Sequence, residues 1–313
     1  MTNVPAARPI LRIGSRGSPL ALVQAREVQT RLAAACGLAP ERIEIKTIRT
    51  TGDQILDRPL ADAGGKGLFT KEIEDALLAG AIDLAVHSSK DMPTALPAGL
   101  VLSAFLPRED ARDAFIGRTA KTLRELRPGA VIGTASPRRQ ALLKHLRPDL
   151  TIVPLRGNVE TRLRKLAAEN IDATVLAVAG LKRLGLLAAA TAIFAVEEFL
   201  PAVAQGAIGL ETRADDAETA ALVAAVNHTD TATAVTAERA FLAELDGSCR
   251  TPIAGYAQVK DGMIRFRGMI AKTDGSEALE VSRQGRPAEA AALGADAGRE
   301  LKGRAGPGFF ERA

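Results

Sequence analysis

The chain has 313 residues, which at about 100–200 residues per domain suggests two or three domains. Hydrophobic residues make up 47% and charged residues 25%, a globular balance that excludes disordered, collagen-like and coiled-coil chains. Aromatic residues amount to only 3%, with no Trp, so the chain has few side chains on which bases or sugar rings could stack.

Cysteine content and hydropathy predict the compartment. The two cysteines, Cys36 and Cys249, fit a reducing cytosol better than a disulfide scaffold. Residues 1–9 lack the apolar core of a signal peptide, and the longest uncharged apolar stretch, 184–196, has 13 residues, too few to cross a bilayer. The sequence therefore predicts a cytoplasmic protein without a membrane partner.

The net charge of +4 is unevenly distributed. Residues 121–185 contain 13 Lys and Arg against 5 Asp and Glu, a local charge of +8, so the remainder sums to −4. Such a region is either a solvated basic face or a binding site for a polyanion. Nucleic acid is one candidate, but no helix-turn-helix, zinc-finger or ribonucleoprotein motif accompanies the charge, and no nucleic-acid partner is predicted.

The first part of the chain alternates strands with helices. After a predicted strand at 10–13, Ser18 stands where an N-cap belongs, Pro19 occupies the first helical position, and Gly37 ends the helix. A strand at 43–48, a helix at about 70–79 and a buried strand at 82–86 follow, and the last runs into His87-Ser88-Ser89-Lys90-Asp91.

The middle of the chain repeats this arrangement of a strand, a Ser-Pro turn and a helix. A strand at 131–134 leads into Ser136-Pro137 and a helix that continues to Leu146; strand 152–155, helix 159–168 and strand 173–178 follow. Alternation of this kind predicts parallel sheets with ligands at the carboxyl ends of the strands. We expect two similar α/β domains that face a common cleft, the plan of periplasmic binding proteins.

The last part differs in pattern. Strands at 253–259, 263–271 and 278–283 are joined by the hairpin dipeptides Asp261-Gly262 and Asp274-Gly275, and a helix near 287–301 covers them. The strand at 207–211 is expected to return to the first domain, followed by helices at 215–226 and 231–245. The predicted domains are 1–106 with about 207–226, 107–206, and a small α+β domain at 227–313 with a three-stranded antiparallel sheet.

Several familiar chemistries are absent from the sequence. It contains no P-loop, GxGxxG, CxxC, HExxH or GxSxG motif, and the three histidines lie far apart. We therefore expect neither a metal site nor Ser-His-Asp catalysis.

Basic residues instead recur at predicted helix starts. Arg16, Arg138 and Arg139 stand at the two Ser-Pro turns, where free N–H groups and guanidinium forks favour anions. Arg156 and Arg162 flank a further helix start, and Lys182-Arg183 follow a strand. One such arginine is usually a surface residue, but their recurrence favours a site for a polycarboxylate or phosphate.

Two other positions have alternative interpretations. Lys90-Asp91 is either an exposed ion pair that closes a turn or a carboxylate placed for acid–base work at the end of a buried strand. Cys249 lies on a Gly-containing loop, where a thiol is either inert or accessible, whereas Cys36 ends an apolar helix stripe and is expected to pack.

Nine segments between residues 12 and 253 occur in the order found in one known family. They are RIGSRGSPLA (12–21), GGKGLF (64–69), HSSKDMP (87–93), RED (108–110), SPRRQ (136–140), LRGNVETR (155–162), AGLKRL (179–184), QG (205–206) and GSCRTPI (247–253). On these segments the sequence closely resembles the porphobilinogen deaminase (hydroxymethylbilane synthase) family. One departure is Ala204, where the family pattern has glycine; the tail after about residue 285 carries little signature.

The resemblance implies a reaction and a cofactor. Four porphobilinogen molecules condense head to tail with loss of ammonia, and hydrolysis releases hydroxymethylbilane in haem biosynthesis. A covalent dipyrromethane, joined by a thioether to the cysteine that matches Cys249, primes the chain. Each pyrrole ring carries an acetate and a propionate, which explains a site rich in arginine that needs no metal. We also expect a monomer.

The resemblance further assigns residues. Asp91 is expected to be catalytic, stabilising a cationic azafulvene and moving protons. The residues expected to bind cofactor or substrate are Arg16, Ser18, Lys90, Ser136, Arg138, Arg139, Arg156, Arg162, Arg183 and Gln205, with Asp53 and Lys66 as weaker candidates.

Two rival functions come from other classes. A receptor of the periplasmic type would share the two-lobed plan but has no need of Cys249, and its intact mass would equal that of the bare chain. A nucleic-acid-binding protein would use the basic region 121–185 and would bind with a steep salt dependence.

Overall fold

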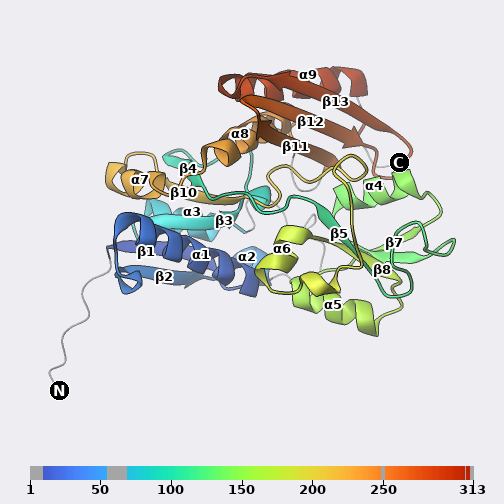
Figure 1. Ribbon diagram of the computed structural model, residues 1–313, viewed down its shortest axis with the longest axis horizontal. Coiled ribbons are helices and arrows are strands. Elements are labelled where there is room, and N and C mark those ends of the chain that lie inside the picture. The colour runs from blue at the N-terminus through green and yellow to red at the C-terminus, as the bar shows by residue number, and fades with distance from the viewer. Residues whose placement is uncertain (1–9, 55–68, 248–250, 307, 311–313) are drawn as a thin grey trace. The chain divides into compact units, whose positions relative to one another are not determined.

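The computed structural model describes residues 10–54, 69–247, 251–306 and 308–310 (Figure 1). The chain divides into two compact units. Unit 1 contains residues Met1–Pro107 and Ile208–His228, and unit 2 contains Arg108–Ala207 and Thr229–Ala313. Within the described residues, none of the helices is long and apolar enough to cross a membrane.

Unit 1 is built on a five-stranded sheet of order β2-β1-β3-β10-β4. Its core lies between this sheet and α1, where Ile13, Leu84, Leu210 and Val28 are fully buried. The elements of unit 1 are β1 (Leu11–Arg16), α1 (Pro19–Cys36), η1 (Pro40–Arg42), β2 (Ile43–Ile48), α2 (Thr51–Gln54), α3 (Lys71–Leu78), β3 (Leu84–Ser88), η2 (Ser89–Asp91), β4 (Leu100–Phe105), β10 (Ile208–Arg213) and α7 (Ala217–Ala224).

Unit 2 contains two sheets, of order β7-β6-β8-β5-β9 and β11-β12-β13. The elements of the first are β5 (Asp113–Gly117), β6 (Val131–Gly133), α4 (Pro137–Leu146), β7 (Thr151–Val153), α5 (Val159–Ala168), β8 (Ala173–Ala177), α6 (Val178–Arg183), η3 (Leu187–Ala189) and β9 (Ala192–Ile193). Those of the second are α8 (Thr229–Glu244), β11 (Ile253–Lys260), β12 (Met263–Ala271), β13 (Ala278–Gly285), η4 (Pro287–Glu289) and α9 (Ala290–Ala305).

The two five-stranded sheets share one pairing pattern. β1 is parallel to β2 and β3, while β10 is antiparallel to β3 and β4. In the same way β6 is parallel to β7 and β8, while β5 is antiparallel to β8 and β9. The expected pair of similar α/β domains is confirmed, as is the return of the strand near 207–211 to the first sheet.

The expectation of parallel sheets is wrong, because both sheets are mixed. Parallel neighbours need a crossover, usually a helix, which dictates their direction. β10 has no such crossover: the chain returns to unit 1 directly through residue 208. Neither β4 nor β5 was predicted from the sequence. β4 pairs in the antiparallel sense with β10, and β5 does so with β8.

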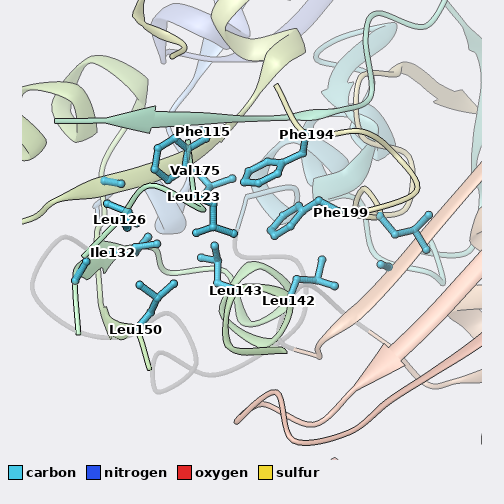
Figure 2. Close-up of a cluster of buried hydrophobic side chains, with 14 of the residues drawn as sticks. Phe115, Leu123, Leu126, Ile132, Leu142, Leu143, Leu150, Val175, Phe194 and Phe199 are labelled. Carbon is cyan, nitrogen blue, oxygen red and sulfur yellow. The ribbon is translucent and has the colours of Figure 1, made fainter. Parts of the chain in front are cut away.

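The core of unit 2 is rich in large side chains (Figure 2). Phe115 on β5 meets the edge of Phe194, which stacks on Phe199 with ring centroids 4.5 Å apart. Leu142 and Leu143 of α4 close the cluster from the other side. This packing holds α4, and with it the arginines at its start, against the sheet.

The predicted C-terminal three-stranded antiparallel sheet with its helix is confirmed, within unit 2. β11, β12 and β13 form an antiparallel meander, and α8 and α9 pack on it. Asp261 and Gly262 have φ values of 53° and 72°, as a two-residue hairpin turn requires. Asp274-Gly275 instead stands in a longer connection between β12 and β13.

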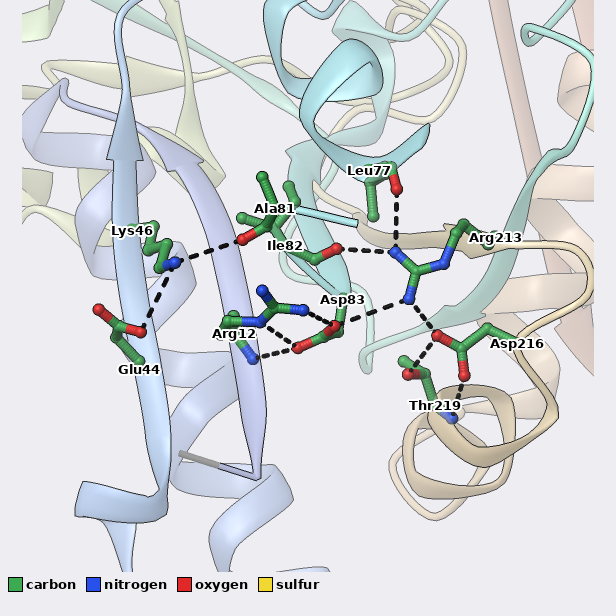
Figure 3. Close-up of polar contacts among 10 residues, drawn as sticks. All are labelled: Arg12, Glu44, Lys46, Leu77, Ala81, Ile82, Asp83, Arg213, Asp216 and Thr219. Carbon is green, nitrogen blue, oxygen red and sulfur yellow. Dashed lines mark hydrogen bonds and ion pairs between the residues drawn. The ribbon is translucent and has the colours of Figure 1, made fainter. Parts of the chain in front are cut away.

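An ion-pair network joins β1, β10 and the residue before β3 in unit 1 (Figure 3). Arg12 donates to both carboxylate oxygens of Asp83, at 2.9 and 2.5 Å, and Arg213 bridges Asp83 and Asp216. Burial alone would raise the pKa of Asp83, but the hydrogen bonds from Arg12 outweigh it and hold that pKa below its usual value. Asp83 of this network stands just before β3, whereas Asp91 stands just after it. The network and Asp91 therefore lie at opposite ends of β3.

Candidate active site

A small cavity of about 60 Å³ lies in unit 1, where β1 and β3 end. Four elements or turns supply its wall: the β1–α1 turn, the first turns of α1, the residues before α3, and the β3–η2 junction. The lining residues are Arg16, Ser18, Leu20, Ala21, Gln24, Phe69, Thr70, Val86, His87, Ser88 and Asp91. The cavity thus brings together three residues expected from the sequence, Arg16, Ser18 and Asp91.

The β1–α1 turn has the predicted capping. Ser18 is the N-cap of α1, and its Oγ accepts a hydrogen bond from the backbone N–H of Ala21 at 3.3 Å. Pro19 occupies the first turn, where its missing N–H costs nothing. The Arg16 guanidinium lies over the Phe69 ring, 4.1 Å from its centroid. The turn therefore presents a cation beside a helix N-terminus whose first turn contains no acidic residue.

Asp91 ends the short helix η2, immediately after β3. Its side chain is exposed, and the neighbouring Lys90 is half-buried. Arg16 and Asp91 line the same cavity. A ligand whose carboxylate pairs with Arg16 can therefore place a cationic group next to the Asp91 carboxylate.

Polar residues, most of them buried, form part of the cavity wall or pack next to it. Gln24 of α1 exchanges hydrogen bonds with Ser88 at 2.9 and 3.0 Å. His87 Nε2 lies 2.9 Å from Oε2 of Glu211 on β10. Glu74 of α3 is also buried; burial raises its pKa, and the charge of Glu211 raises it further. No local sequence pattern indicates these residues as a group, because only the packing of β3 between β1 and β10 brings them together.

In unit 2 the predicted Ser136 cap is confirmed: Ser136 Oγ accepts from the N–H of Arg139 at 3.4 Å. Arg138 and Arg139 are each only 5% exposed, and both bind the buried carboxylate of Asp113, at 2.7 and 2.6 Å. Gln205 is fully buried and donates to Ala111 O at 2.7 Å and to Asp113 at 3.1 Å. Asp113 was missed, since a charged residue at the start of a strand gives no local signal.

The three remaining arginines of unit 2 that the sequence predicts for the site, Arg156, Arg162 and Arg183, are half-buried. Arg162 donates to Gly157 O at 2.8 Å, Arg183 donates to Gly206 O at 3.0 Å, and Arg156 lies between β7 and α5. Asp53 lies in α2. Cys249 and Lys66 lie outside the described residues. Cys36 is a free thiol whose Sγ contacts Leu222 O at 3.8 Å, in agreement with the expected packing role.

The described part of the chain contains no cluster of His, Cys, Asp and Glu side chains that could hold a metal ion. The charged side chains that line the unit 1 cavity are those of Arg16 and Asp91. A guanidinium such as that of Arg16 can bind a ligand carboxylate through two oxygens at once.

Comparison with known proteins places the chain. A family model described as "Porphobilinogen deaminase, dipyromethane cofactor binding domain" matches residues 11–221, and one described as "Porphobilinogen deaminase, C-terminal domain" matches residues 232–303. The porphobilinogen deaminase of Nitrobacter hamburgensis is 62% identical over 298 residues, covering 95% of this chain and 94% of that protein. The one from Paracoccus denitrificans is 56% identical and covers 99% of both chains.

The chloroplastic porphobilinogen deaminase of rice (Oryza sativa subsp. japonica) is 56% identical, covering 96% of this chain and 86% of that protein. Among solved structures, the methionine-binding protein MetQ is similar with a TM-score of 0.44 and 18% identity, covering 69% of this chain and 89% of that one.

Proposed function

Because the chain belongs to the porphobilinogen deaminase family, we propose that Asp91 is its catalytic carboxylate and that Cys249 carries its cofactor. The activity is that of a transferase in haem biosynthesis: four porphobilinogen molecules condense head to tail, each with loss of ammonia, and the product is hydrolysed off as hydroxymethylbilane. What remains to be assigned is the role of each residue.

One observation carries the assignment of Asp91. Its carboxylate shares a single cavity with Arg16 and with the capped start of α1. When ammonia leaves porphobilinogen with the electron pair of the C–N bond, the ring becomes cationic. An acetate or propionate held by Arg16 would place that cation beside Asp91, which stabilises it by charge.

The donor chemistry fits a dipyrromethane, whose two rings bear four carboxylates. We propose that Ser136, Arg138 and Arg139, together with Lys90, Arg156, Arg162 and Arg183, hold the carboxylates of the cofactor and the growing chain. Gln205 belongs to the same proposed set, and Asp53 and Lys66 remain weaker candidates. When bound, the cofactor supplies the pyrrole carbon on which the first new ring is added. Arg138 and Arg139 suit this role because Asp113 already fixes their position.

The test of Asp91 is Asp91→Asn, which keeps the shape and removes the charge. We expect a loss of about 10²–10⁴ in turnover, with the cofactor mass retained in the purified protein. The matched control is Asp75→Asn, on an exposed carboxylate of α3 that pairs only with Lys71 among the described residues; it should keep full activity. Full activity in Asp91→Asn would move the catalytic role elsewhere.

We also propose that the protein works as a cytoplasmic monomer. Support comes from its two cysteines, of which Cys36 is a free thiol. Sedimentation of the active holoenzyme at micromolar concentration should give one species at the mass of a single chain, 32.8 kDa plus cofactor. A dimer mass under conditions of full activity would contradict this.

A further inference from the structure

Three ionisable side chains from three elements gather behind the Asp91 cavity. Glu74 comes from α3, His87 from β3 and Glu211 from β10. Their exposures are 6%, 6% and 0%. His87 Nε2 lies 2.9 Å from Glu211 Oε2, so the imidazole is held by one carboxylate and flanked by a second.

This cluster is incompletely hydrogen-bonded. Oε1 of Glu211 and Oε1 of Glu74 are each buried, and neither has a hydrogen-bond partner among the described residues. A buried ion pair that serves only stability normally has all its polar atoms satisfied, because each orphan acceptor costs about 1–3 kcal/mol. An unpartnered carboxylate oxygen is also a position that a proton can occupy.

His87 connects the cluster to the cavity. It lines the cavity, and its Nδ1 forms no hydrogen bond with another described residue. The charged groups that face it are Glu211 from β10 and Glu74 from α3, with Asp91 and Arg16 across the cavity. The carboxylates of Glu211 and Glu74 therefore lie on the inner side of the imidazole.

Each condensation releases a proton that a group at the cavity must accept. At each condensation the methylene carbon of the incoming unit bonds to a pyrrole carbon, which then loses its proton while the C–H electron pair restores the ring. If Asp91 took that proton, the site would lose the negative charge that stabilises the next cation. A second base at the same cavity would keep Asp91 ionised.

We propose that His87 accepts the proton released at each condensation and that Glu211, with Glu74 behind it, positions the imidazole and stabilises its protonated form. The proton then passes to the ammonia that the same cycle has already released, giving ammonium, so that protons balance over each cycle and no oxidant or reductant is needed. This role rests on the proposed function of Asp91 at the same cavity.

Because the chain has only three histidines, His87 can be titrated individually by NMR of the imidazole nitrogens in the holoenzyme. Single-turnover ring addition is followed in parallel by intact mass as a function of pH. A base must be neutral to accept a proton, so the rate should fall on acidification with the midpoint at which His87 protonates. In Glu211→Gln both midpoints should move together to lower pH, since the carboxylate that contacts the imidazole is gone.

His87→Gln should slow ring addition about 10²-fold at neutral pH while keeping its cofactor mass. The control is His145→Gln in unit 2, where His145 contacts Gly275 O; its rate and pH profile should match the wild type. A His87→Gln rate within twofold of wild type, or a rate midpoint that stays in place when the His87 midpoint moves, would overturn the proposal.

Two further variants separate this proposal from its premises. If Glu211→Gln fails to fold, Glu74→Gln should shift both midpoints in the same direction by a smaller amount; no shift of either counts against the cluster. Asp91→Asn is measured alongside. If it abolishes ring addition while His87→Gln does not affect it, the inference about His87 fails and the role of Asp91 stands.

Discussion

Arg138 donates a hydrogen bond from Nη2 to Oδ2 of Asp113 at 2.7 Å, with both side chains enclosed in unit 2. Arg139 binds the other oxygen of the same carboxylate at 2.6 Å. Burial lowers the pKa of Arg138, and the Asp113 charge opposes that effect. The start of α4 therefore carries guanidiniums whose orientation is set by the protein before a ligand arrives.

We expect the arginines to serve different stages of the reaction, cofactor binding or ring addition. Arg138→Leu should be isolated largely without cofactor, because it removes part of a fixed anion site, and should lose about 3 kcal/mol of stability from the broken buried pair. Arg16→Leu, at the last residue of β1 and next to Gly17, should carry cofactor and stall with few added rings. Intact mass before and after addition of porphobilinogen measures both.

The control for these variants is Arg164→Leu, on an exposed position of α5. It should show full cofactor and the wild-type series of intermediates. If Arg138→Leu and Arg16→Leu both carried full cofactor and gave the same distribution of intermediates, this division of labour would be wrong.

Ala204 has φ of 59°, in the left-handed region that costs a non-glycine residue about 1–2 kcal/mol. Its N–H nevertheless donates to Glu238 Oε2 at 2.6 Å, so the conformation is held by the fold. Ala204→Gly should relieve the strain at a smaller cost in chain entropy, for a net stabilisation of about 0.5 kcal/mol, and should raise the midpoint of thermal unfolding. Ala225→Gly, at a helical φ of −63°, should lower it. Equal shifts in both variants would contradict this account.

Asp83 should contribute stability that depends on pH. Its folded pKa is below the unfolded value of about 3.9, so its contribution is present above that pH and is lost as the pH falls through the folded pKa. Asp83→Asn should therefore cost about 2 kcal/mol at pH 7, and this difference should shrink below pH 4. Denaturant titration at pH 7 and pH 3 measures it; the same loss at both pH values would be the contrary result.

Local signals carried most of the sequence predictions that the structure confirms. The Ser18 and Ser136 caps and the glycine at the end of α1 depend only on neighbouring residues, and each is found as expected. The Ala204 position was noticed only through the resemblance, and its positive φ supplies the physical reason why glycine suits it.

The missed features depend on residues far apart in the chain. His87 and Glu211 are 124 positions apart and meet only because β10 returns to the sheet of unit 1 in the antiparallel sense. Asp113 is 25 residues from Arg138, on β5, which was not predicted. No local pattern indicates that a carboxylate at the start of a buried strand will pair with two arginines.

The most direct test of the account is the intact mass of the purified protein, followed by peptide mapping, for the wild type and for Cys249→Ala. The wild type should exceed the sequence mass by one dipyrromethane, mapped to Cys249, and should add ring masses with porphobilinogen. Cys249→Ala should fold, show the bare chain mass and form no hydroxymethylbilane. A bare wild-type mass in active enzyme, an adduct on Cys36, or near-normal turnover by Cys249→Ala would contradict the account.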